Sequence, residues 1–251
     1  MALTLLLTAL SGGAAALLCG LAPTLSWWWM APIWLGAYVG LGLLYILVII
    51  TLVRFLPPQS VRWVVRPTVA WVMMLLGYRI RLTGADALPD TPFLLVCNHR
   101  SAFDPLCTVA TLARHMAFIA KPGVFRIPVI GTLMRRLGYM PIDRENARNA
   151  VATIKEAAHL IADTELSVGI YPEGTRSKSG DLLPFHAGSF KIAALAKCPV
   201  AVAAIRYEKR PLWGKRVHLC IADVMDADYV TNNNTAAMAE RAVTAITAAL
   251  Q

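Results

Sequence analysis

The sequence predicts an α/β protein with a mixed, largely parallel sheet flanked by helices, preceded by an N-terminal transmembrane helical hairpin and an interfacial helix. Three observations predict this architecture. No charged residue occurs between Ala2 and Val53. Hydrophobic residues make up 57% of the 251-residue chain and charged residues only 16%, which excludes disordered, collagenous and ordinary soluble chains. From residue 78 onward, expected strands alternate with expected helices.

The charge-free stretch is longer than the roughly 20 residues that one bilayer crossing needs. It divides into two apolar segments, 3–25 and 34–53, separated by three tryptophans at 27–29 that suit a membrane–water interface. We therefore expect a transmembrane hairpin over residues 1–56. A cleaved signal peptide is the alternative for the first segment, which lacks a positive n-region and is long for an h-region.

Positive charge begins where the apolar stretch ends. The net charge is +9, and no acid occurs before Asp86. Five arginines precede that acid: Arg54, Arg62, Arg66, Arg79 and Arg81. Their position directly after an apolar stretch favours anionic membrane lipids over nucleic acid as the partner. The positive-inside rule then predicts a multi-pass membrane protein with both termini, and all residues after Arg54, on the cytoplasmic face.

Residues 57–77 are apolar, with Arg62 and Arg66 near their start, and they are too short for a confident third span. They predict an interfacial amphipathic helix, bent or started near Pro67. The five cysteines are an odd number and lie in apolar runs, which is typical of free core thiols in a reducing compartment.

Residues 78–251 form the third expected part, and this length is enough for one core. The expected strands are 79–82, 93–97, 117–119, 139–142, 167–170, 200–205 and 217–221. The expected helices are 103–112, 131–137, 144–162, 189–196 and 235–250, with the asparagines at 232–234 as a turn and cap before the last one. This alternation predicts a largely parallel or mixed sheet.

A histidine and a carboxylate follow the strand expected at 93–97. His99 comes two residues after the strand, and Asp104 lies five residues further on. Ser101 and Asp104 form an S-x-x-D cap, which would fold the carboxylate back toward the imidazole. An Asp that accepts from one ring nitrogen leaves the other nitrogen free as a base. The alternative is that Asp104 only caps the helix and that His99 is a surface loop residue.

A glycine-containing loop follows the strand expected at 167–170. Its sequence, Tyr-Pro-Glu-Gly-Thr-Arg-Ser at 171–177, lacks the Lys-Ser/Thr ending of a nucleotide-binding P-loop. Arg176 in such a turn can hold a phosphate or carboxylate in a two-pronged contact. A structural salt bridge from Arg176 to Glu173 or Asp181 is the alternative.

Two further cations each follow an expected strand. Lys121 begins the segment 121–131, and Arg144 follows the strand at 139–142. Both can add positive charge around an anionic ligand, while the apolar residues of 124–130 line an apolar wall or dip into lipid. Solvated cations above ordinary core residues are the alternative.

Together these segments resemble the membrane-associated glycerolipid acyltransferases of the 1-acylglycerol-3-phosphate acyltransferase type. Asn98-His99-x-Ser101-x-x-Asp104 matches the first motif of that family, and segment 121–131 with residues 142–144 looks like the second. Residues 171–177 look like the third motif, and 198–203 resemble the fourth. The resemblance covers residues 60–205. Gly123 stands where the family often has Glu, and the fourth motif lacks its second proline.

The resemblance implies acyl transfer from a thioester of coenzyme A or acyl carrier protein to the hydroxyl of lysophosphatidic acid, giving phosphatidic acid. His99 would be the general base and Asp104 would stabilise its imidazolium. The implied substrate-binding residues are Arg176, Lys121, Arg144, Glu173, Gly174 and Thr175. No metal, bound cofactor or enzyme nucleophile is needed for direct transfer.

Two other functions stay open at this point. One is an acyltransferase for another lyso-lipid acceptor, such as a lyso-ornithine lipid, which keeps His99 and Asp104 but weakens the phosphate argument. The other is a lipid-binding membrane protein without catalysis. The intact His-x4-Asp and Glu-Gly-Thr-Arg sequences count against it.

Overall fold

The computed structural model describes residues 2–21, 27–53, 55–143, 146–177, 179–211 and 213–251. These residues divide into two compact units, Met1–Val72 and Met73–Gln251. The boundary between the units falls inside a helix, α3, which covers Pro58–Leu75.

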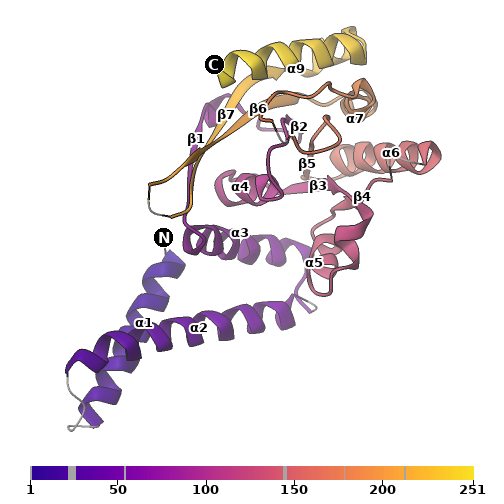
Figure 1. Cartoon of the computed structure of the whole chain (residues 1–251). Coiled ribbons are helices and arrows are strands. Elements are labelled where there is room, and N and C mark those ends of the chain that lie inside the picture. Colours follow the sequence, from indigo (N-terminus) through magenta and orange to yellow (C-terminus); the bar gives the residue numbers. More distant parts are fainter. Residues whose placement is uncertain (1, 22–26, 54, 144–145, 178, 212) are drawn as a thin grey trace. The chain divides into compact units, whose positions relative to one another are not determined.

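The first unit contains a helical hairpin (Figure 1). Helix α1 covers Ala2–Leu21 and packs against α2, which covers Met30–Leu52 after a short 3-10 turn at Trp27–Trp29. Among the described residues, α2 alone is long and apolar enough to cross a membrane, since the apolar part of α1, Ala2–Leu18, is shorter. Most apolar side chains of α2 are exposed, as a lipid-facing helix requires.

Helix α3 packs against α2 within this unit. The indole nitrogen of Trp71 donates to the hydroxyl of Tyr38 at 2.9 Å, and both rings are buried. Gly42 allows the contact, because a Cβ there would lie 2.7 Å from the Trp71 ring. The helix begins at Pro58 and contains Pro67, so of the two expectations for Pro67, a bend or a helix start, the start is wrong. The chain nevertheless forms one helix over most of the expected range 57–77.

The second unit is built on one seven-stranded sheet with the order β1-β7-β6-β2-β5-β3-β4. Every neighbouring pair is parallel except β6 and β7, which form an antiparallel hairpin. The strands are β1 (Tyr78–Thr83), β2 (Leu94–Cys97), β3 (Met116–Ala120), β4 (Met140–Pro141), β5 (Ser167–Ile170), β6 (Val200–Lys209) and β7 (Lys215–Met225). The predicted mixed, largely parallel α/β fold is confirmed.

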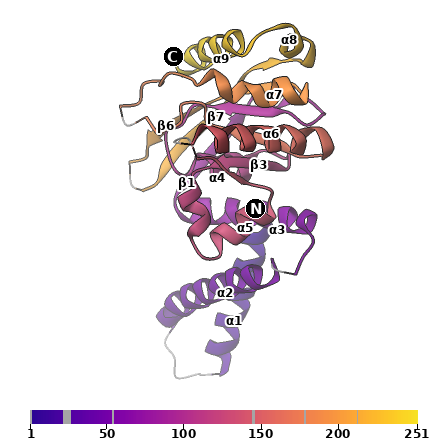
Figure 2. The same ribbon diagram turned by 90° about the vertical axis from the view of Figure 1, so that its right-hand side faces the viewer.

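Helices cover both faces of this sheet, with α6, α7 and α9 on one side and α4 on the other (Figure 2). Residues of β2, β5 and β6 form the main core with the first group of helices. The helices of this unit are α4 (Asp104–Thr111), α5 (Ile130–Arg136), α6 (Ala147–Asp163), α7 (Lys191–Ala196), α8 (Ala227–Asn232) and α9 (Thr235–Leu250). Short 3-10 helices lie at Ala85–Ala87, Pro122–Arg126 and Ala187–Phe190.

The expected elements differ from the observed ones mainly at their ends. Strands β6 and β7 extend beyond the expected ranges because the backbone ladder between them continues past 200–205 and 217–221. Helix α8 was not expected, although Asp226 caps it by accepting the amide of Tyr229 at 2.7 Å. The cap expected before the last helix is present, since Asn234 accepts the amide of Ala237.

Candidate active site

The candidate site lies where β2 ends, at the carboxyl edge that the parallel strands of the sheet share. His99 follows β2, and its Nδ1 lies 2.8 Å from Oδ2 of Asp104, the first residue of α4. The imidazole is about 20% exposed, whereas the carboxylate is fully buried. The predicted pairing of these two side chains is therefore present. Carboxyl ends of parallel strands are the usual place for ligand sites in α/β folds.

Asp104 is held by the loop that precedes it. Its Oδ2 also accepts the backbone amides of Arg100 at 2.8 Å and Ser101 at 2.9 Å. The expected S-x-x-D cap is thus only half formed, because Ser101 Oγ accepts the amide of Phe103 rather than that of Asp104. Since Oδ2 accepts from Nδ1, the second ring nitrogen of His99 is the one left to act as a base.

His99 Nε2 faces no hydrogen-bond partner in the part of the chain that the structure describes. The ring stacks on Tyr171, with 4.4 Å between the ring centroids and 23° between the planes. Tyr171 in turn stacks on Phe118 at 6.1 Å. This stack and the bond to Asp104 fix the plane of the imidazole, so Nε2 points in one defined direction.

The loop after β5 holds the backbone of His99. Glu173 Oε1 accepts the His99 amide at 2.7 Å, and Oε2 accepts the amide of Leu183 at 3.3 Å. The His99 carbonyl accepts the amide of Ser177 at 2.9 Å. Burial raises the pKa of the Glu173 carboxyl, while the two amide bonds partly oppose that shift. Glu173 is therefore an internal brace between two loops.

The sharp turn of this loop depends on Gly174. Its φ is +75°, a left-handed conformation that favours glycine, and its amide donates to the carbonyl of Tyr171 at 3.1 Å. The turn leaves Thr175 and Arg176 exposed. Among the described residues, Arg176 forms no ion pair with Glu173 or Asp181, the two partners that a structural role would need.

The other two expected cations are placed differently. Lys121 follows β3 directly at the same edge of the sheet and is exposed. Arg144 lies outside the described residues.

Three residues of the site were not anticipated from the sequence. Asn98 bridges β2 and β6, since its side chain accepts the amide of Ile205 at 2.7 Å and donates to the carbonyl of the same residue at 3.1 Å. Arg100 donates to the carbonyl of Gly180 at 2.5 Å and joins the two loops. Tyr207 donates its hydroxyl proton to Asp104 Oδ1 at 2.5 Å. The alternation of β6 was a signal for Tyr207, because Ala203, Ile205 and Tyr207 share one face.

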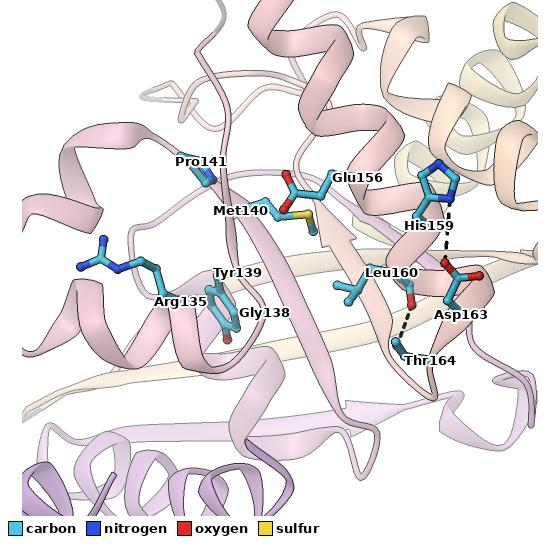
Figure 3. A pocket seen from close by; sticks show the side chains of 10 residues that line it. All are labelled: Arg135, Gly138, Tyr139, Met140, Pro141, Glu156, His159, Leu160, Asp163 and Thr164. Carbon is cyan, nitrogen blue, oxygen red and sulfur yellow. Dashed lines mark hydrogen bonds and ion pairs between the residues drawn. The ribbon is translucent and has the colours of Figure 1, made fainter. Parts of the chain in front are cut away.

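A hollow of about 510 Å³ lies elsewhere in this unit, between β4 and α6 (Figure 3). Its lining includes Tyr139, Glu156, His159 and Asp163, and it contains none of the residues around His99. The pair His159–Asp163 is exposed and 3.9 Å apart, which makes it a weak surface ion pair. Within the described ranges, no group of three His, Cys, Asp or Glu residues is arranged to hold a metal ion.

Comparisons with known proteins place this geometry in a family. A family model described as Acyltransferase matches residues 79–206, the segment that contains His99, Asp104 and the loop around Glu173. The structure is also similar to that of a 1-acyl-sn-glycerophosphate acyltransferase, PlsC, from Thermotoga maritima. The TM-score is 0.68 with 21% identity, over 82% of this chain and 87% of that one. At this identity the likeness shows the fold alone.

Relatives with a higher sequence identity are named 1-acyl-sn-glycerol-3-phosphate acyltransferases. A chloroplastic 1-acyl-sn-glycerol-3-phosphate acyltransferase of Brassica napus is 42% identical over 125 residues, 49% of this chain and 36% of its own length. A 1-acyl-sn-glycerol-3-phosphate acyltransferase of Borreliella burgdorferi is 33% identical over 122 residues, 48% of each chain. The match thus spans between a third and a half of these relatives. Because the family model covers half of the sequence, including His99, Asp104 and Glu173, the chain belongs to the Acyltransferase family.

Proposed function

We propose that this protein transfers a fatty acyl group from a thioester to the free hydroxyl of lysophosphatidic acid, giving phosphatidic acid. One observation carries the proposal: His99 is held by Asp104 through Nδ1, while Nε2 has no described partner. Family membership and the names of the relatives support the reaction class and the acceptor.

The geometry supports direct transfer with His99 as general base. Nε2 takes the proton of the acceptor hydroxyl as its oxygen attacks the thioester carbonyl, and the tetrahedral intermediate then collapses. The carbon–sulfur bond breaks, and the departing thiolate receives the proton back from Nε2. Asp104 stabilises the imidazolium that exists between these two transfers. Such a base contributes about 10²–10⁴ in rate.

Arg176 is our first choice for the phosphate of the acceptor. It is exposed at the edge that carries His99, and a guanidinium holds a phosphate through two parallel hydrogen bonds. Lys121 and Arg144 are weaker candidates for the same role. We assign Gly174 and Thr175 to the turn that presents Arg176. Glu173 positions the loop that contains His99, because both of its carboxylate oxygens accept hydrogen bonds from backbone amides.

A basic, partly apolar segment supports anionic lipids as partners. Between Asp104 and Asp143 the sequence contains five Lys or Arg residues and no acid. The exposed side chains of Ile127, Val129 and Ile130 lie within this segment. Cations next to exposed aliphatic groups suit the headgroup layer of an anionic leaflet. We further propose that α1 and α2 both cross the membrane and that residues 78–251 are cytoplasmic.

A donor-by-acceptor assay on the purified full chain in detergent tests the function. The donors are palmitoyl-coenzyme A and palmitoyl-acyl carrier protein; the acceptors are lysophosphatidic acid and a lyso-ornithine lipid. Thiol release and lipid product are both measured, with His99→Ala as the inactive control and the exposed His159→Ala as the matched one.

We expect phosphatidic acid and thiol in equal amounts, formed by the wild type and His159→Ala but not by His99→Ala. Acylation of the lyso-ornithine lipid alone would replace the acceptor. If no combination of donor and acceptor released thiol, the proposed catalysis would be wrong and a lipid-binding role would be favoured.

A further inference from the structure

The two oxygens of Asp104 have different surroundings. Oδ2 accepts three donors, namely His99 Nδ1 and the amides of Arg100 and Ser101. Oδ1 accepts the hydroxyl of Tyr207 at 2.5 Å. Because the carboxylate is fully buried, Tyr207 supplies the one described hydrogen bond to Oδ1.

The direction of this hydrogen bond is fixed by its neighbours. An ionised carboxylate only accepts, so the single hydroxyl proton of Tyr207 points to Asp104. The Cys107 sulfur lies 3.7 Å from the same hydroxyl oxygen, and the thiol is therefore the donor of that contact. Burial raises the pKa of Tyr207 far above neutral, and Asp104 adds to the shift. Tyr207 thus stays a neutral donor at every working pH.

We propose that Tyr207 is a positioning residue of this site, whose hydroxyl draws charge from Asp104 and so limits how strongly Asp104 holds a proton on His99. The proposal rests on the proposed function of His99 as a general base. A base must be neutral to accept a proton, and it must also return that proton to the departing thiolate. A carboxylate with more negative charge would hold the proton on the imidazolium more tightly and so slow its return to the thiolate.

Removal of the Tyr207 hydroxyl should therefore change the pKa of His99 in a predictable direction. Without Tyr207, more negative charge faces His99 Nδ1, and the imidazolium form gains stability. His99 should then hold its proton to higher pH than in the wild type. We expect a rise of about 0.5–1 pH unit, within the range that single hydrogen bonds to a charged group produce.

Other titratable and charged groups also face this cluster from the elements around it. They are Tyr78 on β1, Cys97 on β2, Arg100, Cys107 on α4, Tyr171, Glu173 and Lys215 on β7, whose Nζ lies 5.4 Å from the centroid of the Tyr207 ring. Burial raises the pKa of both thiols, that of Cys107 to about 12, and of both phenols, so these four groups stay neutral. Arg100, Glu173 and Lys215 remain as charged neighbours. All three are present in every variant compared, and Tyr207→Phe keeps the ring that Lys215 faces.

The test compares Tyr207→Phe with Tyr139→Phe, which removes a buried phenol oxygen next to the hollow of Figure 3. The full chain carries labelled histidine, and His99→Gln identifies the His99 signal among the five histidines. NMR titration without substrate gives the His99 pKa, and the acid limb of kcat/KM gives the same quantity kinetically. We expect both to rise in Tyr207→Phe and to stay unchanged in Tyr139→Phe.

A second variant keeps the proposal testable if Tyr207→Phe does not fold. Placing 2,3,5-trifluorotyrosine at position 207 by nonsense suppression retains the ring and makes the hydroxyl a stronger donor. The His99 pKa should then fall instead of rise. Loss of activity with an unchanged His99 pKa in both variants would overturn the proposal and leave Tyr207 a purely structural residue. Because the titration needs no substrate, it decides this point even if no acceptor is acylated.

Discussion

The backbone amide of His99 donates to Glu173 Oε1 at 2.7 Å, so a carboxylate after β5 fixes a histidine after β2. The two residues are 74 positions apart in the sequence. The family resemblance made Glu173 a substrate-binding candidate, but both of its oxygens are used inside the protein. The loop that exposes Arg176 is thereby the same loop that holds His99 in place.

Loss of Glu173 should impair folding and catalysis together. Glu173→Ala leaves two amides without an acceptor, which costs about 1–3 kcal/mol for each buried group. Glu173→Gln keeps one acceptor and should be intermediate. Thermal unfolding in detergent and turnover of the folded fraction measure the two effects. Normal stability and turnover in Glu173→Ala would contradict the role of Glu173 in holding the two loops together.

The same residue should give stability a definite pH dependence. Burial raises the pKa of the Glu173 carboxyl in the folded state, compared with about 4.3 in an unfolded chain. Its stabilising contribution is then complete below the unfolded value and decreases as pH rises through the folded one. Relative to wild type, Glu173→Gln should be least stable at low pH, with the gap narrowing as pH rises. Denaturant unfolding at a series of pH values measures the difference in unfolding free energy between wild type and Glu173→Gln. A difference that grows as pH rises would contradict the predicted direction.

Removal of the base should abolish turnover without unfolding the protein. His99→Ala should lower kcat by at least ~10²-fold. Asp104→Asn should also be severe, since it removes the charge that stabilises the imidazolium. Ser101→Ala should be mild because Ser101 Oγ only accepts the amide of Phe103. A lethal Ser101→Ala together with a mild His99→Ala would require an acyl-enzyme route instead.

Substitution of Arg176 should impair the use of lysophosphatidic acid but not that of the thioester donor. Arg176→Lys loses the two-pronged contact, and Arg176→Ala loses the charge as well, so kcat/KM for lysophosphatidic acid should fall by about 10- to 150-fold. The KM of the thioester donor should change little. Steady-state kinetics with an acceptor that lacks a phosphate supply the control. An equal loss with both acceptors would show that Arg176 supports the loop and would favour the ornithine-lipid alternative.

The predicted membrane orientation can be tested with protease. Added outside intact spheroplasts of an expression host, protease should spare residues 78–251 and destroy them only after lysis. The arginines that begin at Arg54 are the physical reason, since positive loops stay in the cytoplasm. Cleavage of the domain in intact spheroplasts would reverse the orientation.

Two glycines of the segment after β3 should respond oppositely to the same change. A Cβ at Gly131 would lie 2.0 Å from the carbonyl oxygen of Phe125, whereas a Cβ at Gly123 meets no atom within 4 Å. Gly131→Ala should therefore destabilise the domain by at least about 1–3 kcal/mol. Gly123→Ala should be neutral or slightly stabilising. Thermal unfolding of the two variants side by side gives the answer, and equal melting temperatures would contradict the close approach.

The sequence predicted those parts of the site that depend on short-range spacing. His99 and Asp104 are five residues apart, so a strand end followed by a helix start was enough to bring them together. Apolar runs likewise located the strands of the sheet. Glu173 was assigned to the correct loop, but its inward direction depends on an amide 74 residues away.

Long-range contacts explain what the sequence did not predict. Tyr207 meets Asp104 across 103 residues, and Arg100 meets Gly180 across 80. The alternation along β6 indicates the face of the strand on which Tyr207 lies, but no local pattern shows which distant residue it contacts. The expected strand at 200–205 ended where charged residues interrupt the apolar run. The observed strand continues past that point, because the β6–β7 ladder is made of backbone hydrogen bonds that need no apolar side chain. Tyr207 lies in this continuation, which the prediction did not include.

The strand order has a consequence for biosynthesis. Strand β2 pairs with β5 and β6, which are both made long after it. In a chain growing from its N-terminus, His99 therefore waits for Glu173, and Asp104 waits still longer for Tyr207. By then the whole of α2 has been made. The apolar hairpin is thus complete before the site is, and a fragment that stops short of β6 lacks both the strand that pairs with β2 and the Tyr207 hydroxyl that binds Asp104.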